Sequence, residues 1–192
     1  PILLHFSTDE VYGDITDGEH IETDILNPSN PYSATKAAAD QLILAWARTY
    51  KLPYVILRPT NNYGIGQYTE KLIPKSIKYL GLDKPIPLHN EGTPIRNWLH
   101  AQDTANAVIT IIERPYHVRD EIYNICGGFE QSNLTTVKKI IELYHQEDED
   151  LADKFPHYPQ RRVFEYIDFD YSRQGQDIRY ALNDDKLRKL GW

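Results

Sequence analysis

Two short groups of polar residues have the types and spacing for acid–base chemistry. The first is Ser7-Thr8-Asp9-Glu10, which directly follows the apolar run 1–6. Two adjacent carboxyl groups in different surroundings can hold different pKa values, so that one acts as an acid and the other as a base. A polar turn that only leaves a strand is the competing interpretation, and these four residues alone do not decide between the two.

The second group is Tyr32 with Lys36. Residues four apart lie on one face of a helix, one turn from each other. A phenol loses its proton near pH ~10, and a nearby ammonium group favours the phenolate. Such a pair is a plausible general base for an alcohol that is being oxidised. Tyrosine and lysine at this spacing also occur in many helices simply as an exposed pair.

A strand, a helix and a second strand are predicted to position both groups. The apolar runs 1–6 and 54–57 have the character of buried parallel strands. Between them, Asn30 is expected to cap a helix that begins with Pro31 and runs through residues 34–50. This pattern predicts a right-handed βαβ unit. Ligands of open α/β sheets bind beyond the carboxyl ends of the strands, where the first polar group lies.

The rest of the chain predicts a mixture of helices and strands. Further helices are expected over residues 72–80 and 103–113, and from a cap at Ser132 through His145. Strands are expected over residues 86–88, 95–99, 121–126 and 163–167. Asn183 is expected to cap a short closing helix that stops at Gly191.

Composition excludes several classes of protein. The net charge is −7 with acids and bases interspersed, so no basic face for nucleic acid is expected. The sequence shows neither an apolar run long enough to span a bilayer nor a secretory leader. The single cysteine, Cys126, excludes an internal disulfide and suits a reducing compartment. We therefore expect a cytoplasmic protein without a metal or a membrane partner. Because the chain starts with Pro1 and has no methionine, we interpret it as a fragment or a processed piece.

Order and distance combine these signals into a specific pattern. Thr-Asp-Glu-Val-Tyr-Gly at 8–13 is followed by Asn-Pro-Tyr-x-x-x-Lys at 30–36 and by Asn-Asn-Tyr-Gly at 61–64. This order resembles the extended short-chain dehydrogenase/reductase family, and within it most closely the dTDP-glucose 4,6-dehydratases. The similarity continues through residues 70–74, 95–99 and 123–125 and ends with 190–192, which covers nearly the whole chain.

The resemblance implies NAD-dependent conversion of dTDP-glucose to dTDP-4-keto-6-deoxyglucose by oxidation, loss of water and return of the hydride. Tyr32 would take the proton of the sugar hydroxyl at carbon 4. Lys36 would hold Tyr32 ready and contact the cofactor ribose, and Thr8 would hydrogen-bond the same sugar oxygen. Glu10 would remove the proton at carbon 5, and Asp9 would protonate the hydroxyl that leaves carbon 6.

Asp9 separates this activity from related ones. In the 4-epimerases and UDP-glucuronate decarboxylases of the family, the pattern at the place of Thr8-Asp9 resembles Ser-Ser or Thr-Ser. Neither kind of enzyme needs a second carboxyl to expel water. UDP-glucose is the nearest alternative substrate. A sugar-nucleotide-binding fragment that is catalytically incomplete is the alternative from another class, because the glycine-rich turn that seats the NAD pyrophosphate is absent from these residues.

The resemblance also implies binding residues. Asn62 would lie near the cofactor together with Tyr32 and Lys36, and Asn61 on the substrate. The remaining substrate-binding candidates fall into a diphosphate group (Lys71, Arg96, Arg173), a base and ribose group (Leu72, Pro87, His89, Asn133), and Gln176, which replaces the histidine of the family's usual Arg-Pro-Gly-His-Asp.

The fold class expected is α/β: the C-terminal part of a Rossmann-like doubly wound parallel sheet plus a smaller mixed α/β substrate-binding domain. Residues 1–66 would form the partial Rossmann-like domain with the Tyr-x-x-x-Lys helix. Residues 67–192 would mainly form the sugar-nucleotide-binding domain, with about 95–125 returning to the Rossmann-like sheet. The resemblance further implies a homodimer in the complete protein.

Overall fold

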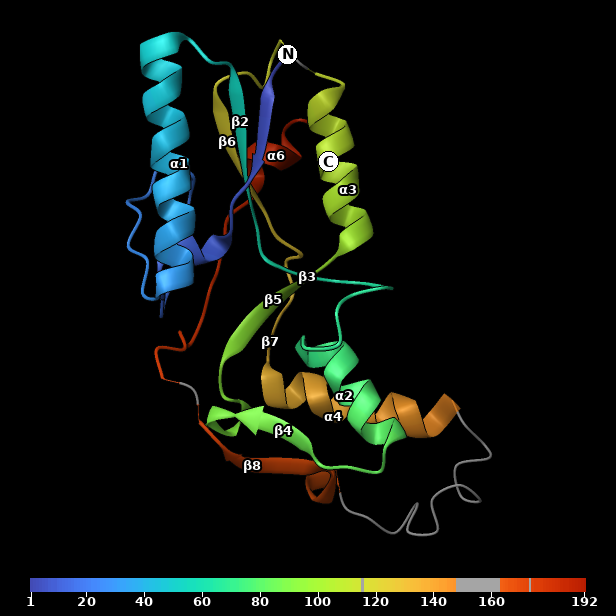
Figure 1. Ribbon diagram of the computed structural model, residues 1–192. Helices are drawn as coiled ribbons and strands as arrows, with labels where there is room; N and C mark the ends of the chain where they lie inside the picture. The colour runs from blue at the N-terminus through green and yellow to red at the C-terminus, as the bar shows by residue number, and fades with distance from the viewer. Residues whose placement is uncertain (115, 148–162, 173) are drawn as a thin grey trace. The chain divides into compact units, whose positions relative to one another are not determined.

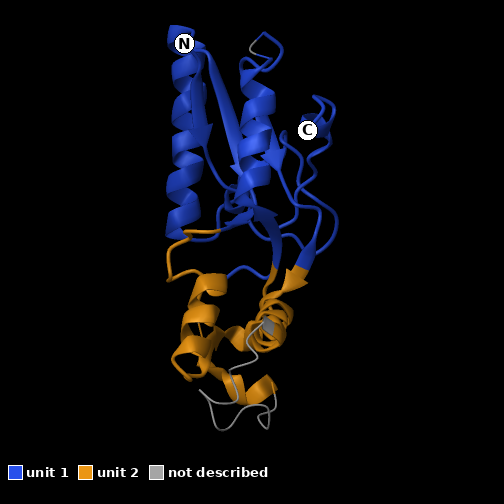
Figure 2. Cartoon of the chain, turned by 90° about the vertical axis from the view of Figure 1, so that its right-hand side faces the viewer, with its two compact units in different colours: residues 1–64, 96–130, 175–192 blue, residues 65–95, 131–174 orange. Residues whose placement is uncertain are grey.

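A computed structural model describes residues 1–114, 116–147, 163–172 and 174–192 (Figure 1). The chain divides into two compact units (Figure 2). Unit 1 contains residues 1–64, 96–130 and 175–192, and unit 2 contains residues 65–95 and 131–174. Each unit has its own core. That the two are separate domains, one for the cofactor and one for the substrate, stays a prediction.

Unit 1 is built on a parallel sheet of three strands. They are β1 (Leu3–Phe6), β2 (Tyr54–Pro59) and β6 (Glu121–Ile125), in the order β1-β2-β6. Leu57 lies opposite Tyr123, and both neighbouring pairs of strands run parallel. The expected strands are therefore confirmed, as is the α/β class with a parallel sheet.

The long helix between the first two strands is also confirmed. It is α1 (Pro31–Tyr50), and Asn30 caps it. The Asn30 side chain accepts a hydrogen bond from the Ser33 backbone N–H, while the Ser33 hydroxyl accepts one from the Asn30 backbone N–H, which is a complete capping box. The helix ends where Lys51 takes a left-handed conformation with a φ of 59°.

Strand β2 has a helix on each side. Its alternate residues Val55 and Leu57 pack in one core cluster with residues of α3 (Ala101–Ile112). On the opposite face Arg58 reaches α1, where it forms an ion pair with Asp40. This alternation is the two-residue period of a strand that is buried on both faces, and the two helices flank the sheet in the view of Figure 1.

The expected helix over residues 103–113 is thus present as α3, although it begins two residues earlier.

A second small sheet has the order β3-β5-β7, formed by β3 (Asn61–Tyr63), β5 (Ile95–His100) and β7 (Glu130–Ser132). Asn61 of β3 lies opposite Trp98 of β5 in a parallel pair. The strands expected at residues 95–99 and 121–126 are confirmed to within one residue.

The C-terminal segment 175–192 clusters with unit 1, although the sequence placed it in the second domain. The physical reason is a set of side-chain contacts to β6, among them a hydrogen bond of 3.2 Å from the Asn124 amide to the Asn183 carbonyl. The closing helix is α6 (Asp185–Arg188), and its N-cap is Asp184. Asn183, the expected cap, lies one residue before that position, although its Oδ1 accepts a hydrogen bond of 3.1 Å from the Asp185 backbone N–H, and the helix ends before Gly191.

Unit 2 packs two helices against a pair of parallel strands. The helices are α2 (Leu72–Gly81) and α4 (Asn133–Glu147), and the strands are β4 (Ile86–His89) and β8 (Ile167–Tyr171). A short 3-10 turn, Asn90–Gly92, follows β4. The buried residues that form its core are Leu80, Ile86, Leu88, Val137, Ile141, Tyr166 and Ile167.

One strand of unit 2 was predicted in the wrong place. Residues 163–167 have the β-branched and aromatic composition of a strand, yet Val163–Tyr166 forms a 3-10 turn. Pairing with β4 begins only where Ile167 lies opposite Ile86. The tertiary partner, not local composition, decides where this strand starts. No helix in the part of the chain that the structure describes combines the length and the apolar character needed to cross a membrane.

Candidate active site

A tight turn holds the two adjacent carboxyl groups at the end of β1. The chain leaves the strand through Thr8 and forms a 3-10 turn, Asp9–Tyr12. The Thr8 hydroxyl donates a hydrogen bond of 3.0 Å to Asp9 Oδ1 and accepts one of 3.4 Å from the Glu10 backbone N–H. Gly13 ends the turn with a φ of 85°, and a Cβ there would lie 2.3 Å from the Asn27 carbonyl oxygen. This geometry requires glycine.

Asp9 is a buried acid with an incomplete set of partners. Asp9 is 2% exposed, and its Oδ2 atom has no hydrogen-bond partner in the described part of the chain. Burial, and then the neighbouring Glu10 carboxylate, raise the pKa of Asp9 to about 7, while the Thr8 hydroxyl and Arg96 act in the opposite direction. Asp9 can therefore carry a proton near neutral pH. Glu10 is only partly buried, so the two carboxyls have the different surroundings that the sequence suggested.

Helix α1 brings Tyr32 to the same place. Tyr32 is 55% exposed, and its pKa is raised by burial and by the carboxylates of Glu10 and Asp9, against a hydrogen bond with Thr8 that lowers it. The Lys36 ammonium donates a hydrogen bond of 2.5 Å to the carbonyl of the last β1 residue. The direction of the Tyr32 shift is thus opposite to the one expected from a nearby ammonium alone, because burial and two negative charges act on the phenol.

Arg96 lies beside these carboxyls in a fixed position. Only 9% of it is exposed, and its guanidinium donates hydrogen bonds of 3.1 Å to the Asp177 carbonyl and 3.4 Å to the Ile178 carbonyl. It also lies over the Tyr180 ring, 4.9 Å from its centroid. The positive charge is therefore held by the C-terminal segment, close enough to Asp9 to lower its pKa. Contact of Arg96 with a diphosphate stays a prediction.

Several buried polar atoms at this edge of the sheet have no partner in the described residues. They are Ser7 Oγ, Asp9 Oδ2, Thr60 Oγ1 and Asn61 Oδ1. Asn62, by contrast, is held by neighbours: its amide donates a hydrogen bond of 2.9 Å to the Thr60 carbonyl, and Thr104 donates to its Oδ1. Because buried polar groups normally have partners, the orphaned atoms fit a polar ligand. Ser7 was not among the candidate site residues, and only its burial distinguishes it.

The remaining predicted residues lie mostly in unit 2. Lys71 is exposed before α2, Leu72 is the first residue of that helix, and Pro87 is buried in β4. His89 Nδ1 in β4 and Asn133 Oδ1 at the start of α4 are buried without a hydrogen-bond partner among the described residues. Gln176 is partly buried in unit 1, and Arg173 lies outside the described residues. Their joint action on one nucleotide stays a prediction.

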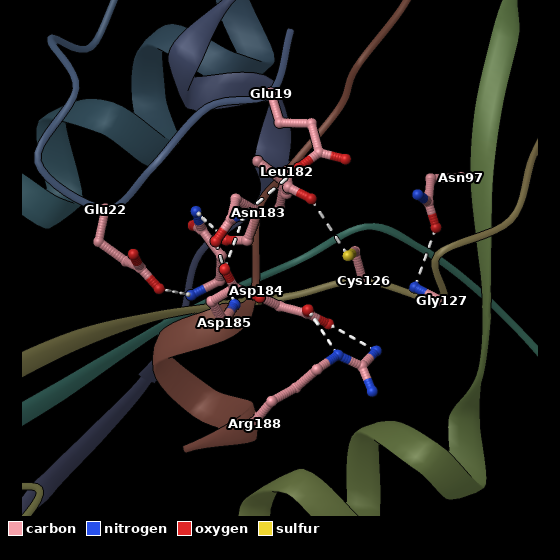
Figure 3. Close-up of polar contacts among 11 residues, drawn as sticks. Glu19, Glu22, Asn97, Cys126, Gly127, Leu182, Asn183, Asp184, Asp185 and Arg188 are labelled. Atoms are coloured by element: carbon pink, nitrogen blue, oxygen red, sulfur yellow. Dashed lines mark hydrogen bonds and ion pairs between the residues drawn. The ribbon is translucent and has the colours of Figure 1, made fainter. Parts of the chain in front are cut away.

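The single cysteine has a structural environment. Its Sγ contacts the Leu182 carbonyl at 3.2 Å (Figure 3). Burial, and then the carboxylate of Asp184, raise the pKa of Cys126 to about 12, so the thiol is not activated. Asp184 itself forms an ion pair of 2.7 Å with Arg188.

The sequence matches a known family. Residues 2–126 match the model of the NAD dependent epimerase/dehydratase family. The chain belongs to this family. Among curated relatives, the dTDP-glucose 4,6-dehydratase of Neisseria gonorrhoeae is 44% identical over 191 residues, which is 98% of this chain and 53% of that protein. The low-salt glycan biosynthesis protein Agl12 of Haloferax volcanii is 39% identical, over 99% of this chain and 56% of that protein.

Solved structures of the same kind superimpose on it. A dTDP-glucose 4,6-dehydratase from Bacillus anthracis in complex with NAD is 35% identical, with a TM-score of 0.84 over 99% of this chain and 55% of that one. The dTDP-glucose 4,6-dehydratase DesIV from Streptomyces venezuelae, with NAD and TYD bound, is 32% identical, with a TM-score of 0.85 over 100% of this chain and 54% of that one. The chain therefore spans about half the length of the relatives it matches.

Proposed function

We propose that the full-length protein containing this chain is a nucleotide-sugar 4,6-dehydratase that converts dTDP-glucose to dTDP-4-keto-6-deoxyglucose. The observation that carries the proposal is the pair of neighbouring carboxyls, with Asp9 buried and holding a pKa of about 7 beside the partly buried Glu10. Elimination of water needs an acid and a base on the same sugar, and this turn offers both next to Tyr32.

The side chains divide the reaction among them. Tyr32 takes the proton of the sugar hydroxyl at carbon 4, with the Thr8 hydroxyl on the same oxygen. Glu10 then removes the proton at carbon 5, which is acidic once carbon 4 is a ketone. Asp9 gives its proton to the hydroxyl at carbon 6, which leaves as water. Each step uses a group that the turn or the start of α1 holds in place.

The cofactor of the proposed reaction is NAD, which accepts the hydride from carbon 4 and returns it at carbon 6. Tyr32, Lys36 and Asn62 would hold its nicotinamide and ribose end. The orphaned Ser7 and Asn61 oxygens suit a polar ligand of this kind at the ends of the strands. In the NAD-bound relative from Bacillus anthracis the same cofactor accompanies the same fold.

Asp9 favours this reaction over the others of the family. Epimerisation and decarboxylation need no acid to expel water, so a buried protonated carboxyl would have no task in them. UDP-glucose is the alternative substrate, because the choice between thymine and uracil depends on small contacts to the base, and none of the catalytic residues makes them. A homodimer in the cytoplasm is part of the same proposal.

Mass spectrometry of the substrate tests the proposal. The full-length protein is incubated with NAD and either dTDP-glucose or UDP-glucose, and the sugar nucleotide is followed for loss of one water. Loss of water from dTDP-glucose is expected, with Tyr32→Phe as the inactive control. Loss only from UDP-glucose would move the assignment to that nucleotide. Binding of either nucleotide without loss of water would contradict a dehydratase and favour a sugar-nucleotide-binding protein.

A further inference from the structure

The start of helix α1 contacts the proposed base directly. Asn30 Nδ2 lies 3.4 Å from Glu10 Oε2, although the two residues are 20 positions apart. Among the described residues, this amide is the hydrogen-bond donor that reaches the Glu10 carboxylate. We propose that Asn30 is a positioning residue for Glu10, with one side chain capping the catalytic helix and orienting the base. The proposal rests on the dehydratase function proposed above.

The capping bond fixes which end of the amide points at Glu10. Asn30 Oδ1 accepts a hydrogen bond of 3.0 Å from the Ser33 backbone N–H. An amide nitrogen in that position would place two donors against each other, so the oxygen must be there. The NH2 group then necessarily points the other way, toward the Glu10 carboxylate. The helix start and the base are therefore joined through one rigid planar group.

Capping alone does not need asparagine. Serine, aspartate and asparagine are about equally good at this position of a helix, because each offers an oxygen to the backbone. Only asparagine among them also carries an NH2 donor on the far side. Aspartate would instead place a second negative charge next to Glu10. The feature that sets Asn30 apart is thus its NH2 group, which capping does not use.

The contact links two catalytic groups. Tyr32 lies two residues after Asn30 in the first turn of α1, and Glu10 lies on the turn after β1. Since the amide holds Oε2, the carboxylate has a defined orientation relative to Tyr32. Proton removal from carbon 5 depends on that orientation, whereas the preceding step at carbon 4 depends on Tyr32 itself. Loss of the donor should therefore affect one step and not the other.

The chain contains a matched control. Asn183 makes similar contacts just before α6 (Figure 3): its Oδ1 accepts a hydrogen bond of 3.1 Å from the Asp185 backbone N–H, and its Nδ2 donates one of 3.4 Å to Glu19 and one of 3.4 Å to the Asp185 carboxylate. None of these partners belongs to the proposed catalytic group. Asn183→Ser removes an NH2 donor of the same kind, also next to a helix start, without touching the base.

The test is single-turnover kinetics of Asn30→Ser and Asn183→Ser in the full-length protein with NAD and dTDP-glucose. Absorbance of the reduced cofactor reports oxidation at carbon 4, and rapid quench with mass spectrometry reports loss of water. Asn30→Ser is expected to slow the loss of water about 10-fold or more while oxidation keeps its rate. Asn183→Ser should change neither. Equal slowing of both steps by Asn30→Ser would show a structural cap only, and no slowing would also overturn the proposal.

A second readout needs no turnover. The side-chain amide resonances of Asn30 in ¹⁵N-labelled protein are compared between wild type, Glu10→Gln and Asp9→Asn. Glu10→Gln is expected to shift the Asn30 NH2 resonances most, with Asn183 unchanged. Absence of that shift overturns the contact. If the wild-type protein eliminates no water, the proposed function fails, while the resonances still decide whether Asn30 holds the carboxylate.

Discussion

Two polar clusters of unit 1 each contain a carboxyl group that is buried to the same degree, but the partners of the two carboxyl groups differ. The Arg58 network consists of Tyr12, Asp40 and Arg58, and the candidate catalytic cluster consists of Thr8, Asp9, Glu10 and Tyr32. Asp40 is 0% exposed and Asp9 is 2% exposed. Asp40 Oδ2 accepts a hydrogen bond of 3.0 Å from the Arg58 guanidinium, and its Oδ1, which has no hydrogen-bond partner among the described residues, lies 3.4 Å from His5 Nε2. Asp9 Oδ1 accepts a hydrogen bond of 3.0 Å from the Thr8 hydroxyl, and its Oδ2 has no hydrogen-bond partner in the described residues.

The difference shows how one fold uses the same residue type in two ways. In the Arg58 network, the guanidinium also donates a hydrogen bond of 2.7 Å to the Tyr12 hydroxyl, which in turn donates one of 2.8 Å to Asn124. A buried charge with this many partners ties α1 to the sheet. A buried carboxyl without them takes up a proton instead, and a proton available near neutral pH is useful in catalysis.

The largest expected effect on stability comes from removing the cation of the Arg58 network. Arg58→Met leaves the Asp40 carboxylate buried without its partner, which costs about 3–5 kcal/mol of unfolding free energy. Urea denaturation of wild type and variant measures the loss. The control is Arg119→Met, since the Arg119 side chain is 55% exposed and its ion pair with Asp120 contributes little. A loss below about 1 kcal/mol for Arg58→Met would end the contrast between the clusters.

Asp9→Asn should stabilise the protein, whereas Arg58→Met destabilises it. Folding raises the pKa of Asp9 from 3.8 to about 7, so the folded state pays an ionisation cost that is absent below the lower value and complete above the higher one. The variant is therefore expected to be more stable than wild type at about pH 8, by at most about 4 kcal/mol.

The same comparison at low pH is the control for Asp9→Asn. The advantage should shrink as the pH falls from about 7 and vanish near pH 4, because wild-type Asp9 is then protonated in the folded state and increasingly so in the unfolded one. Denaturation midpoints along a pH series measure this. A variant that is less stable than wild type at every pH would contradict the account of Asp9 as an unpaired buried acid.

Two tyrosines give the smallest and most direct contrast. Tyr12→Phe removes the hydroxyl that Arg58 and Asn124 share, so a loss of about 1–3 kcal/mol is expected. Tyr32→Phe changes a residue that is 55% exposed, and its stability should stay within about 0.5 kcal/mol of wild type. Thermal unfolding compares the two variants. In the full-length protein Tyr32→Phe should instead suppress the first hydride transfer, and unchanged turnover would refute its role as base.

Local signals were enough to predict the three elements that hold the candidate site. The apolar runs and the Asn30-Pro31 start determine β1, α1 and β2, because strand period, capping and proline act within a few residues. The start of β8 after a 3-10 turn and the packing of residues 175–192 were not predictable in this way. Both depend on partners far along the chain, such as Ile86 for β8 and Asn124 for the C-terminal segment.

The chemistry of the site was only partly visible in the sequence. Residues 7–10 have the composition of an exposed turn, yet the following Val11 and Tyr12 are buried in a core cluster and draw Asp9 inward with them. Its pKa follows from that burial. Likewise Asn30 was predicted as a cap, but its contact with Glu10 depends on how the turn after β1 lies against α1, which no local pattern contains.

The most direct test of the central claim is the single-turnover behaviour of Asp9→Asn in the full-length protein. Reduced cofactor and loss of water are followed together after mixing with dTDP-glucose and NAD. If Asp9 is the acid, oxidation at carbon 4 keeps its rate while loss of water slows about 10²–10⁴-fold, and reduced cofactor accumulates. If oxidation and loss of water slow together, Asp9 is not the group that protonates the leaving hydroxyl.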